Sequence, residues 1–229
     1  MSSAVDSLPR FDRGPRPYFR GLLHANAVWY FAGTGSALTV ASFILHGSSA
    51  LSWFTALYAV CLVAMLGVSG LYHRAPWRSE GAVRGWRRAD HSMIAIFIAG
   101  TYGPVTVSTF DTFADGQWVL LVCWIAALVA VAINVFWIGH PRWLDVGIYL
   151  ALGWLIIFKI TDFAREVPTA AGLLIVIGGL IYMVGAISYG LKRPNFSERW
   201  FGFHEFFHAT TVVAAGLHHV AIWLIVLES

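Results

Sequence analysis

Charged side chains are scarce in this sequence. Only 12% of its 229 residues are Asp, Glu, Lys or Arg, about half the share that is usual in a soluble domain. Hydrophobic residues make up 58% of the chain, and the mean hydropathy is +0.69. A balance so poor in charge argues against an ordinary soluble domain and favours a membrane protein.

The sequence has few cysteines and a small net charge. The two cysteines, Cys61 and Cys123, lie inside apolar runs, where thiols behave as small hydrophobic groups, so no disulfide framework is expected. The formal net charge is +3, but the basic residues are spread over loops and membrane edges. This distribution is typical of membrane topology, and we expect no binding to nucleic acid.

Seven apolar runs of bilayer-spanning length dominate the chain. They predict an all-α, multi-pass protein of the cell (plasma) membrane, folded as a seven-transmembrane helix bundle. The loops are short, which indicates a single transmembrane domain over residues 25–229 after an N-terminal tail over residues 1–24. The fifth run is the least regular, because Asp145 and Lys159 lie near its ends. The runs are Ala25 to Leu45, Leu51 to Tyr72, Met93 to Phe110, Trp118 to Ile138, Trp143 to Ile160, Ala170 to Leu191 and His204 to Leu227.

Lysine and arginine are distributed unevenly between the two sides of the predicted bundle. All of them except Lys159 and Arg165 fall in the N-terminal tail or in the loops that follow even-numbered runs. By the positive-inside rule, we predict that the N-terminus is cytoplasmic and that the C-terminus lies outside. The first run has no small-residue cleavage pattern at its end, which indicates a retained helix rather than a signal peptide.

The last run opens with His204-Glu-Phe-Phe-His208. On a helix, two histidines four residues apart lie on one face, so both imidazoles can reach one metal ion. His-Glu-x-x-His is the pattern that zinc hydrolases use. Alone it is weak evidence, because a chain with nine histidines readily contains such a pair by chance.

The predicted topology brings further polar groups to the same membrane edge. His73 ends the second run with Ser69 one turn deeper on its face, and Asp90 precedes the third run. All lie on the cytoplasmic side with His204 and His208, where ionisable groups are costly unless they are paired or coordinated. Three imidazoles leave a zinc ion one open position for water, as in catalytic zinc sites. Asp90 is the candidate base that would orient this water.

Several spaced motifs resemble the haemolysin III family, which belongs with the adiponectin and progestin receptors and, more distantly, with the alkaline ceramidases. The resemblance covers essentially all seven runs. It rests on Ser69-Gly-Leu-Tyr-His73, on Asp90-His-Ser92 after sixteen intervening residues, on Ile98-Ala-Gly-Thr-Tyr-Gly-Pro104 and on His204-Glu-Phe-Phe-His208.

The resemblance implies a seven-helix bundle that holds zinc (Zn2+) near its cytoplasmic face. The implied metal ligands are His73, His204 and His208. Asp90 matches the family aspartate near the water, and Ser69 matches the serine of the family motif. We therefore take Asp90 and Ser69 as the candidate catalytic residues.

One family motif is incomplete in this chain. The first-span pattern, Glu-x-x-Asn-x-x-Ser/Thr-His, corresponds here to Leu23, Asn26, Trp29 and Tyr30, so only the asparagine matches. Either the missing groups are dispensable, or His24 substitutes for one of them, or this member has altered chemistry.

Two polar residues of the last run have open roles. Glu205 is the base in the soluble metalloprotease pattern, but it lies about 100° around the helix from His204. Contact with lipid headgroups or with the neighbouring basic loop is the simpler expectation. His218 returns to the face of His204 about 21 Å along the axis, where it either lines an inner cavity or bonds to a neighbouring helix.

These residues favour a zinc-dependent, ceramidase-like hydrolase that acts on a lipid amide or ester, with its lipid substrate or product in a cavity of the bundle. A lipid-sensing, receptor-like protein with structural zinc would carry the same residues. Membrane lysis, the activity that gives the family its name, is a further alternative, although charges are absent from the middle of the runs. An intramembrane zinc protease would use Asp145 as third ligand and leave His73 and Asp90 without a role.

Overall fold

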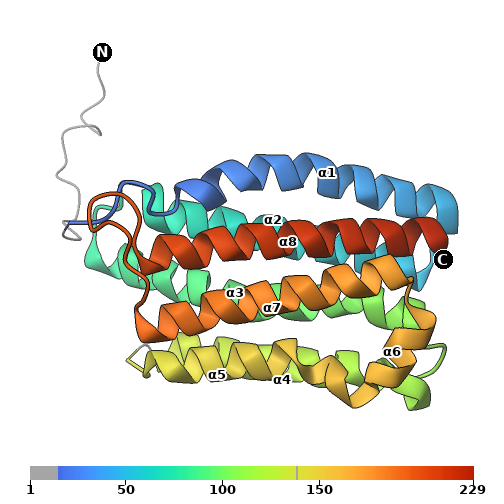
Figure 1. The fold of residues 1–229 in the computed structure, drawn as a ribbon. Helices are drawn as coiled ribbons and strands as arrows, with labels where there is room; N and C mark the ends of the chain where they lie inside the picture. The colour runs from blue at the N-terminus through green and yellow to red at the C-terminus, as the bar shows by residue number, and fades with distance from the viewer. Residues whose placement is uncertain (1–14, 138) are drawn as a thin grey trace.

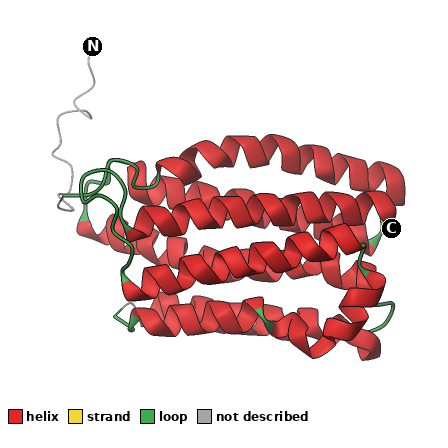
Figure 2. Ribbon diagram, viewed as in Figure 1, coloured by secondary structure: helices red, strands yellow, loops and turns green. Residues whose placement is uncertain are grey.

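Helical segments of membrane-spanning length run side by side and form one bundle (Figures 1 and 2). The structure, a computed structural model, describes residues 15–137 and 139–229, so residues 1–14 of the predicted tail lie outside the description. Seven segments of this described part are long and apolar enough to cross a membrane. The prediction of an all-α, seven-helix bundle is confirmed.

Six of the spans are built on one long helix each, and the fifth is composite. The single helices are α1 (Leu22–His46), α2 (Ala50–Arg74), α3 (Glu80–Thr109), α4 (Trp118–Phe136), α7 (Thr169–Leu191) and α8 (Phe203–Glu228). A π-helical turn, Phe113–Gln117, leads into α4. The fifth span consists of α5 (Arg142–Gly153), a 3-10 segment (Leu155–Lys159) and α6 (Ile160–Glu166).

α2, α3 and α8 are the most deeply buried spans of the bundle. α8 packs mainly against α7 and α1, α2 packs between α1 and α3, and α5 packs beside α7 (Figure 1). Tyr58 and Leu62 of α2 and Ile222 of α8 are fully buried. By contrast, Trp29 of α1 and Phe136 of α4 are 78% and 86% exposed, as expected for side chains that face lipid.

α3 starts at Glu80, well before the predicted start of the third run at Met93. Ser79 caps the helix, because its Oγ accepts a hydrogen bond from a backbone N–H three residues on (3.2 Å). Glu80 also pairs with Arg84 one turn later (3.3 Å). The predicted loop before the third run is therefore mostly helical, and Asp90 lies inside α3 rather than before it.

The break in the fifth span is stabilised by a side chain of α3. The Tyr102 hydroxyl lies 2.9 Å from the carbonyl oxygen of Leu152 and 3.1 Å from that of Gly153. It also accepts a hydrogen bond from the backbone N–H of Ile156 (3.1 Å). Tyr102 thus satisfies backbone groups that the interrupted helix leaves free, which is required inside a membrane.

The end of the predicted tail packs against the bundle. α1 starts slightly earlier than predicted, and residues 15–21 run beside the loop between α7 and α8 (Figure 1). The backbone N–H groups of Tyr18 and Phe19 donate to the carbonyl groups of Arg199 and Trp200 (2.9 and 3.3 Å). These residues therefore form a short cover over the end of the bundle at which α2 ends and α8 begins.

An odd number of spans places the two chain ends on opposite sides of a membrane. Because the positive-inside rule puts the start of α8 in the cytoplasm, we expect alkaline phosphatase fused after Ser229 to be active and green fluorescent protein fused there to be dark. Fusions truncated after Lys192 should show the reverse pattern. Fluorescence at the C-terminal fusion, with inactive phosphatase, would contradict the predicted orientation.

Candidate metal centre

Three histidines from two helices meet where α2 ends and α8 begins. His73 lies in the last turn of α2, and His204 and His208 lie in the first two turns of α8. One ligand atom of each lies within 4.8 Å of the other two. The Nε2 atoms of His73 and His204 are 3.2 Å apart. The three predicted ligands therefore form one cluster.

The chemistry of this cluster suits a metal ion. His73 and His208 are only 6% and 2% exposed, and the Nε2 atoms of His73 and His204 face each other across 3.2 Å. A shared cation gives facing ring nitrogens a common partner. A donor set of imidazole nitrogens suits zinc and related transition metals better than magnesium or calcium.

Asp90 approaches the cluster from α3. Its Oδ2 atom lies 3.6 Å from Nε2 of His73, and the residue is 9% exposed. Ser69, one turn before His73 on α2, is 3% exposed. Both side chains line the same cavity as His204 and His208. The two candidate catalytic residues thus lie beside the three candidate ligands.

His24 of α1 stacks on His208. The two ring centroids are 3.9 Å apart, and the ring planes differ by 15°. The rings of His204 and His73 meet His208 at longer distances and steeper angles, 4.7 Å with 42° and 5.0 Å with 62°. Metal-bound histidines are usually oriented by a hydrogen bond to the second ring nitrogen. Nδ1 of His208 has no such bond among the described residues, so the stacked ring of His24 is the candidate group for orienting this imidazole.

Both carboxylate oxygens of Glu205 are engaged away from the cluster. Oε2 accepts a hydrogen bond from the backbone N–H of Gly202 (2.8 Å), and Oε1 contacts Nε of Arg20. Glu205 is 1% exposed. It therefore caps α8 and ties the N-terminal segment to it. The expected contact with basic groups is present, although the partner comes from the N-terminal segment rather than from a loop.

The N-terminal segment passes directly against His73. Arg16 donates a hydrogen bond to the carbonyl oxygen of His73 (3.2 Å). Gly21 has a φ of 73°, and a Cβ atom at this position would overlap the Cβ atom of His73. Both the backbone conformation and the close approach require glycine. Residues 15–21 thus cover the His73 side of the cluster.

A second polar cluster is centred on Asp145 of α5. Its Oδ1 atom lies 2.8 Å from Nε2 of His140, and its Oδ2 atom lies 3.3 Å from Nδ1 of His91. The Tyr149 hydroxyl donates to the carbonyl oxygen of His91 (2.8 Å). Sequence reasoning did not find this cluster, because its members come from separate segments without a motif.

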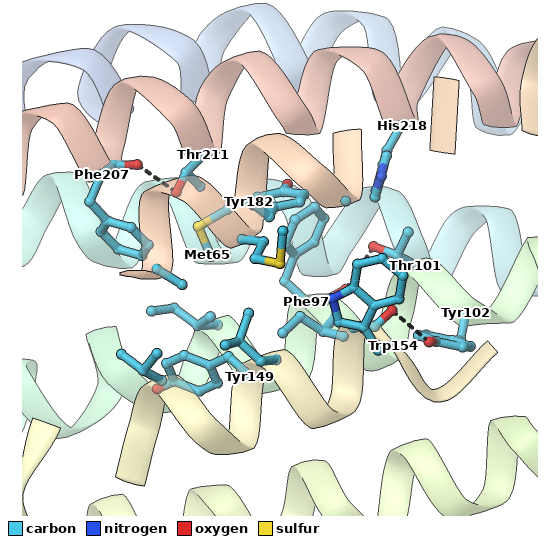
Figure 3. A pocket seen from close by; sticks show the side chains of 18 of the residues that line it. Met65, Phe97, Thr101, Tyr102, Tyr149, Trp154, Tyr182, Phe207, Thr211 and His218 are labelled. Carbon is cyan, nitrogen blue, oxygen red and sulfur yellow. Dashed lines mark hydrogen bonds between the residues drawn. The ribbon is translucent and has the colours of Figure 1, made fainter. Parts of the chain in front are cut away.

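An apolar cavity of about 200 Å³ reaches the histidine cluster and extends between α3, the fifth span and α7. Met65, Phe97 and Tyr182 point into it (Figure 3). Two residues of its wall, Trp154 and Val176, are also 41% and 44% exposed at the outer surface. Part of the cavity wall is therefore formed by residues of the fifth span and α7 that are also exposed.

His218 lies at the deep end of this cavity, as Figure 3 shows. Its Nε2 atom donates to the carbonyl oxygen of Ile175 on α7 (3.0 Å). Both expectations for His218 thus hold at once: it lines the inner cavity, and it bonds to a neighbouring helix.

The fold and the cluster define a multi-pass membrane protein whose described residues form seven spans, with a three-histidine candidate metal site at one end of the bundle. A family model described as Haemolysin-III related matches residues 14–219. The chain therefore belongs to the haemolysin III-related family, which confirms the resemblance seen in its motifs.

Individual relatives agree with this assignment. The chain is 31% identical to the Hemolysin-3 homolog of Bacillus subtilis (strain 168) over 115 residues, which are 50% of this chain and 54% of that protein. It is 28% identical to Hemolysin-3 of Bacillus cereus over 183 residues, 76% of this chain and 80% of the relative. It is 26% identical to the Adiponectin receptor protein of Drosophila melanogaster over 180 residues, 70% of this chain and 39% of that protein. The match thus spans about half the length of the B. subtilis protein and most of the B. cereus protein.

Replacement of His24 tests whether its stacked ring orients His208. We expect His24→Ala to weaken zinc binding roughly 10- to 100-fold, the usual effect of losing a group that orients a ligand. His24→Phe keeps an aromatic ring at this position and should bind zinc nearly as tightly as the wild type. Competition with a chromophoric zinc chelator measures both affinities. Unchanged affinity in the alanine variant, or an equal loss in both variants, would contradict the stacking role.

Replacement of Glu205 tests its structural role. Glu205→Gln leaves the Arg20 guanidinium without its charged partner. We expect the free energy of unfolding, measured by titration with SDS in mixed micelles, to fall by about 2 kcal/mol. The loss is smaller than for a fully buried pair, because 20% of the Arg20 side chain is exposed. The double variant Arg20→Gln/Glu205→Gln should recover part of the lost free energy of unfolding. An unchanged free energy of unfolding in Glu205→Gln would contradict a stabilising ion pair.

Proposed function

We propose that this protein is a zinc-dependent hydrolase that cleaves an amide or ester bond of a membrane lipid. The observation that carries the proposal is the position of the three-histidine cluster and Asp90 together at one end of an apolar cavity. His73, His204 and His208 would hold the ion. Bound zinc supplies a Lewis acid that polarises a carbonyl group and activates water.

Asp90 is the proposed base. Its carboxylate lies 3.6 Å from a ring nitrogen of His73, on the side of the cluster that faces the cavity. There it accepts a proton from the attacking water, whose oxygen forms the new bond to the carbonyl carbon. When the C–N or C–O bond breaks, Asp90 returns the proton to the leaving amine or alcohol. The hydroxyl group of the water thus ends on the carbonyl carbon and its proton on the leaving group, so no further reactant is needed.

Ser69 is the proposed partner of the substrate carbonyl. The residue lines the cavity one turn before His73 and is 3% exposed. Its hydroxyl is a hydrogen-bond donor that can stabilise negative charge as it develops on the carbonyl oxygen. A donor in a water-poor site contributes more to such stabilisation than a donor in bulk water.

The cavity supports a lipid as the substrate. Its wall is mostly apolar, and the exposed positions of Trp154 and Val176 connect it with the surface that faces lipid. An acyl chain can enter from the bilayer with its carbonyl group next to the histidine cluster. The hydrolysed bond is therefore proposed to lie at the polar end of the acyl chain.

A receptor-like role is the second candidate. The name of the Drosophila relative, Adiponectin receptor protein, favours it, and a lipid that binds without being cleaved would use the same cavity. The names of the two Bacillus relatives favour membrane lysis instead. A zinc protease has the weakest support, because the carboxylate of Asp145 contacts His91 and His140.

The test is to measure zinc content and lipid cleavage in the same purified preparations. We expect about one zinc per wild-type chain and turnover of fluorogenic lipid amides or esters. His204→Ala should lose both zinc and turnover. Asp90→Asn should keep zinc but lower kcat by roughly 10²- to 10⁴-fold, the usual contribution of a general base. His46→Gln, at the other end of the bundle, is the matched histidine control and should change neither.

Different outcomes separate the candidate functions. Lipid cleavage that persists without metal contradicts the hydrolase proposal. Tight, zinc-dependent lipid binding with no cleavage favours the receptor-like role. Release of dye from liposomes by the purified protein, unaffected by loss of zinc, favours lysis.

A further inference from the structure

A small hollow lies between α3, α4 and α5, and it shares His91 and Asp145 with the wall of the large cavity. Its volume is about 10 Å³, enough for one water-sized group. The polar residues around it are Arg87, Arg88, His91, Asn134, His140, Arg142 and Asp145.

Two guanidinium groups offer unused donors at this hollow. The Nε atom of Arg88 and the Nη1 atom of Arg142 are buried, and neither has a hydrogen-bond partner among residues 15–137 and 139–229. A guanidinium group has donors and no acceptor. Buried donors of this kind are normally satisfied in a native structure. An acceptor from outside the described residues, either a water molecule or an anion, would satisfy these donors.

The acidic side chain of the hollow does not fill this role. The two carboxylate oxygens of Asp145 contact His140 at 2.8 Å and His91 at 3.3 Å. The side-chain amide of Asn134 donates to a backbone carbonyl of its own helix (3.0 Å). Three arginines thus stand against one carboxylate that two imidazoles already share. The hollow keeps an excess of positive charge.

Two aromatic rings hold the guanidinium group of Arg142 in position. Its guanidinium carbon lies 5.3 Å from the ring centroid of Tyr189 and 5.9 Å from that of Phe203. These cation–π contacts restrict the side chain without using its hydrogen-bond donors. Arg87, which is exposed at the mouth of the hollow, adds a third guanidinium group.

We propose that this hollow is a binding site for a phosphate group, with Arg88 and Arg142 as its inner donors and Arg87 at its mouth. The hollow admits one phosphate oxygen, and the rest of the group remains at the opening. Several guanidinium groups that converge from different helices match the multiple acceptor oxygens of a phosphate. The site also lies at the end of the bundle that is predicted to be cytoplasmic, where basic pockets between helices bind anionic headgroups.

Two sources can supply this phosphate: the headgroup of an anionic phospholipid or a soluble phosphate ester. The experiment uses the full-length protein in detergent micelles. Native mass spectrometry measures binding of phosphatidylglycerol and of phosphatidylcholine with the same acyl chains. Calorimetric titration with inorganic phosphate forms a separate arm. Binding of phosphatidylglycerol alone assigns the site to a lipid headgroup, whereas binding of inorganic phosphate assigns it to a soluble ester.

The variants test the inner donors directly. We expect Arg88→Gln and Arg142→Gln to weaken binding roughly tenfold for whichever probe binds the wild type, phosphatidylglycerol or inorganic phosphate. This is the usual effect of losing one charge-assisted hydrogen bond. Arg84→Gln is the matched control, because Arg84 lies on the same helix and pairs with Glu80 at the surface. Arg142→Gln also removes the contacts with Tyr189 and Phe203, so Arg88→Gln is the cleaner variant.

Two results would overturn the proposed phosphate site. Phosphatidylglycerol binding no tighter than phosphatidylcholine binding, together with no binding of inorganic phosphate, overturns the proposal and leaves a hollow that holds water. An equal loss of affinity for the probe in Arg84→Gln and Arg88→Gln also overturns the proposal. His204→Ala should lose zinc but keep the phosphate probe, so this test is independent of the hydrolase proposal.

Discussion

Inside an apolar bundle, a polar side chain costs free energy unless another group satisfies it. This constraint determines where the polar residues of the protein lie. Tyr102 bonds to the backbone at the break in the fifth span, and Glu205 is matched by Arg20 and a backbone N–H. The histidine cluster is another concentration of buried nitrogen atoms, and a bound cation would meet the same requirement for it.

The cluster depends on contacts between segments far apart in sequence. His73 and His204 come together because α2 ends where α8 begins. Gly21 lets the N-terminal segment approach His73, and Arg20 of this segment holds the start of α8 through Glu205. His24 then stacks on His208 from a third helix. The first span thus contributes to the site through packing, although its sequence lacks most of the family's first-span motif.

The sequence predicted the fold and the candidate ligands because both depend on local patterns. The lengths of the apolar runs predict seven spans. The alternation of basic loops predicts that His73, Asp90 and the histidine pair of α8 lie at one membrane edge. The early start of α3 was missed because its first turns carry arginines and do not form an apolar run, although Ser79 is a recognisable helix cap. The stack of His24 and the partners of Asp145 were not predictable, because they depend on how separate helices pack.

The central claim is that His73, His204 and His208 hold one zinc ion with an open position beside Asp90. X-ray absorption spectroscopy at the zinc edge tests it most directly. The account predicts three imidazole nitrogens and one oxygen ligand at about 2.0 Å from the metal, and loss of this signal in His73→Ala. A first coordination shell that contains sulfur or four imidazoles would contradict it. A purified protein without zinc would contradict it as well.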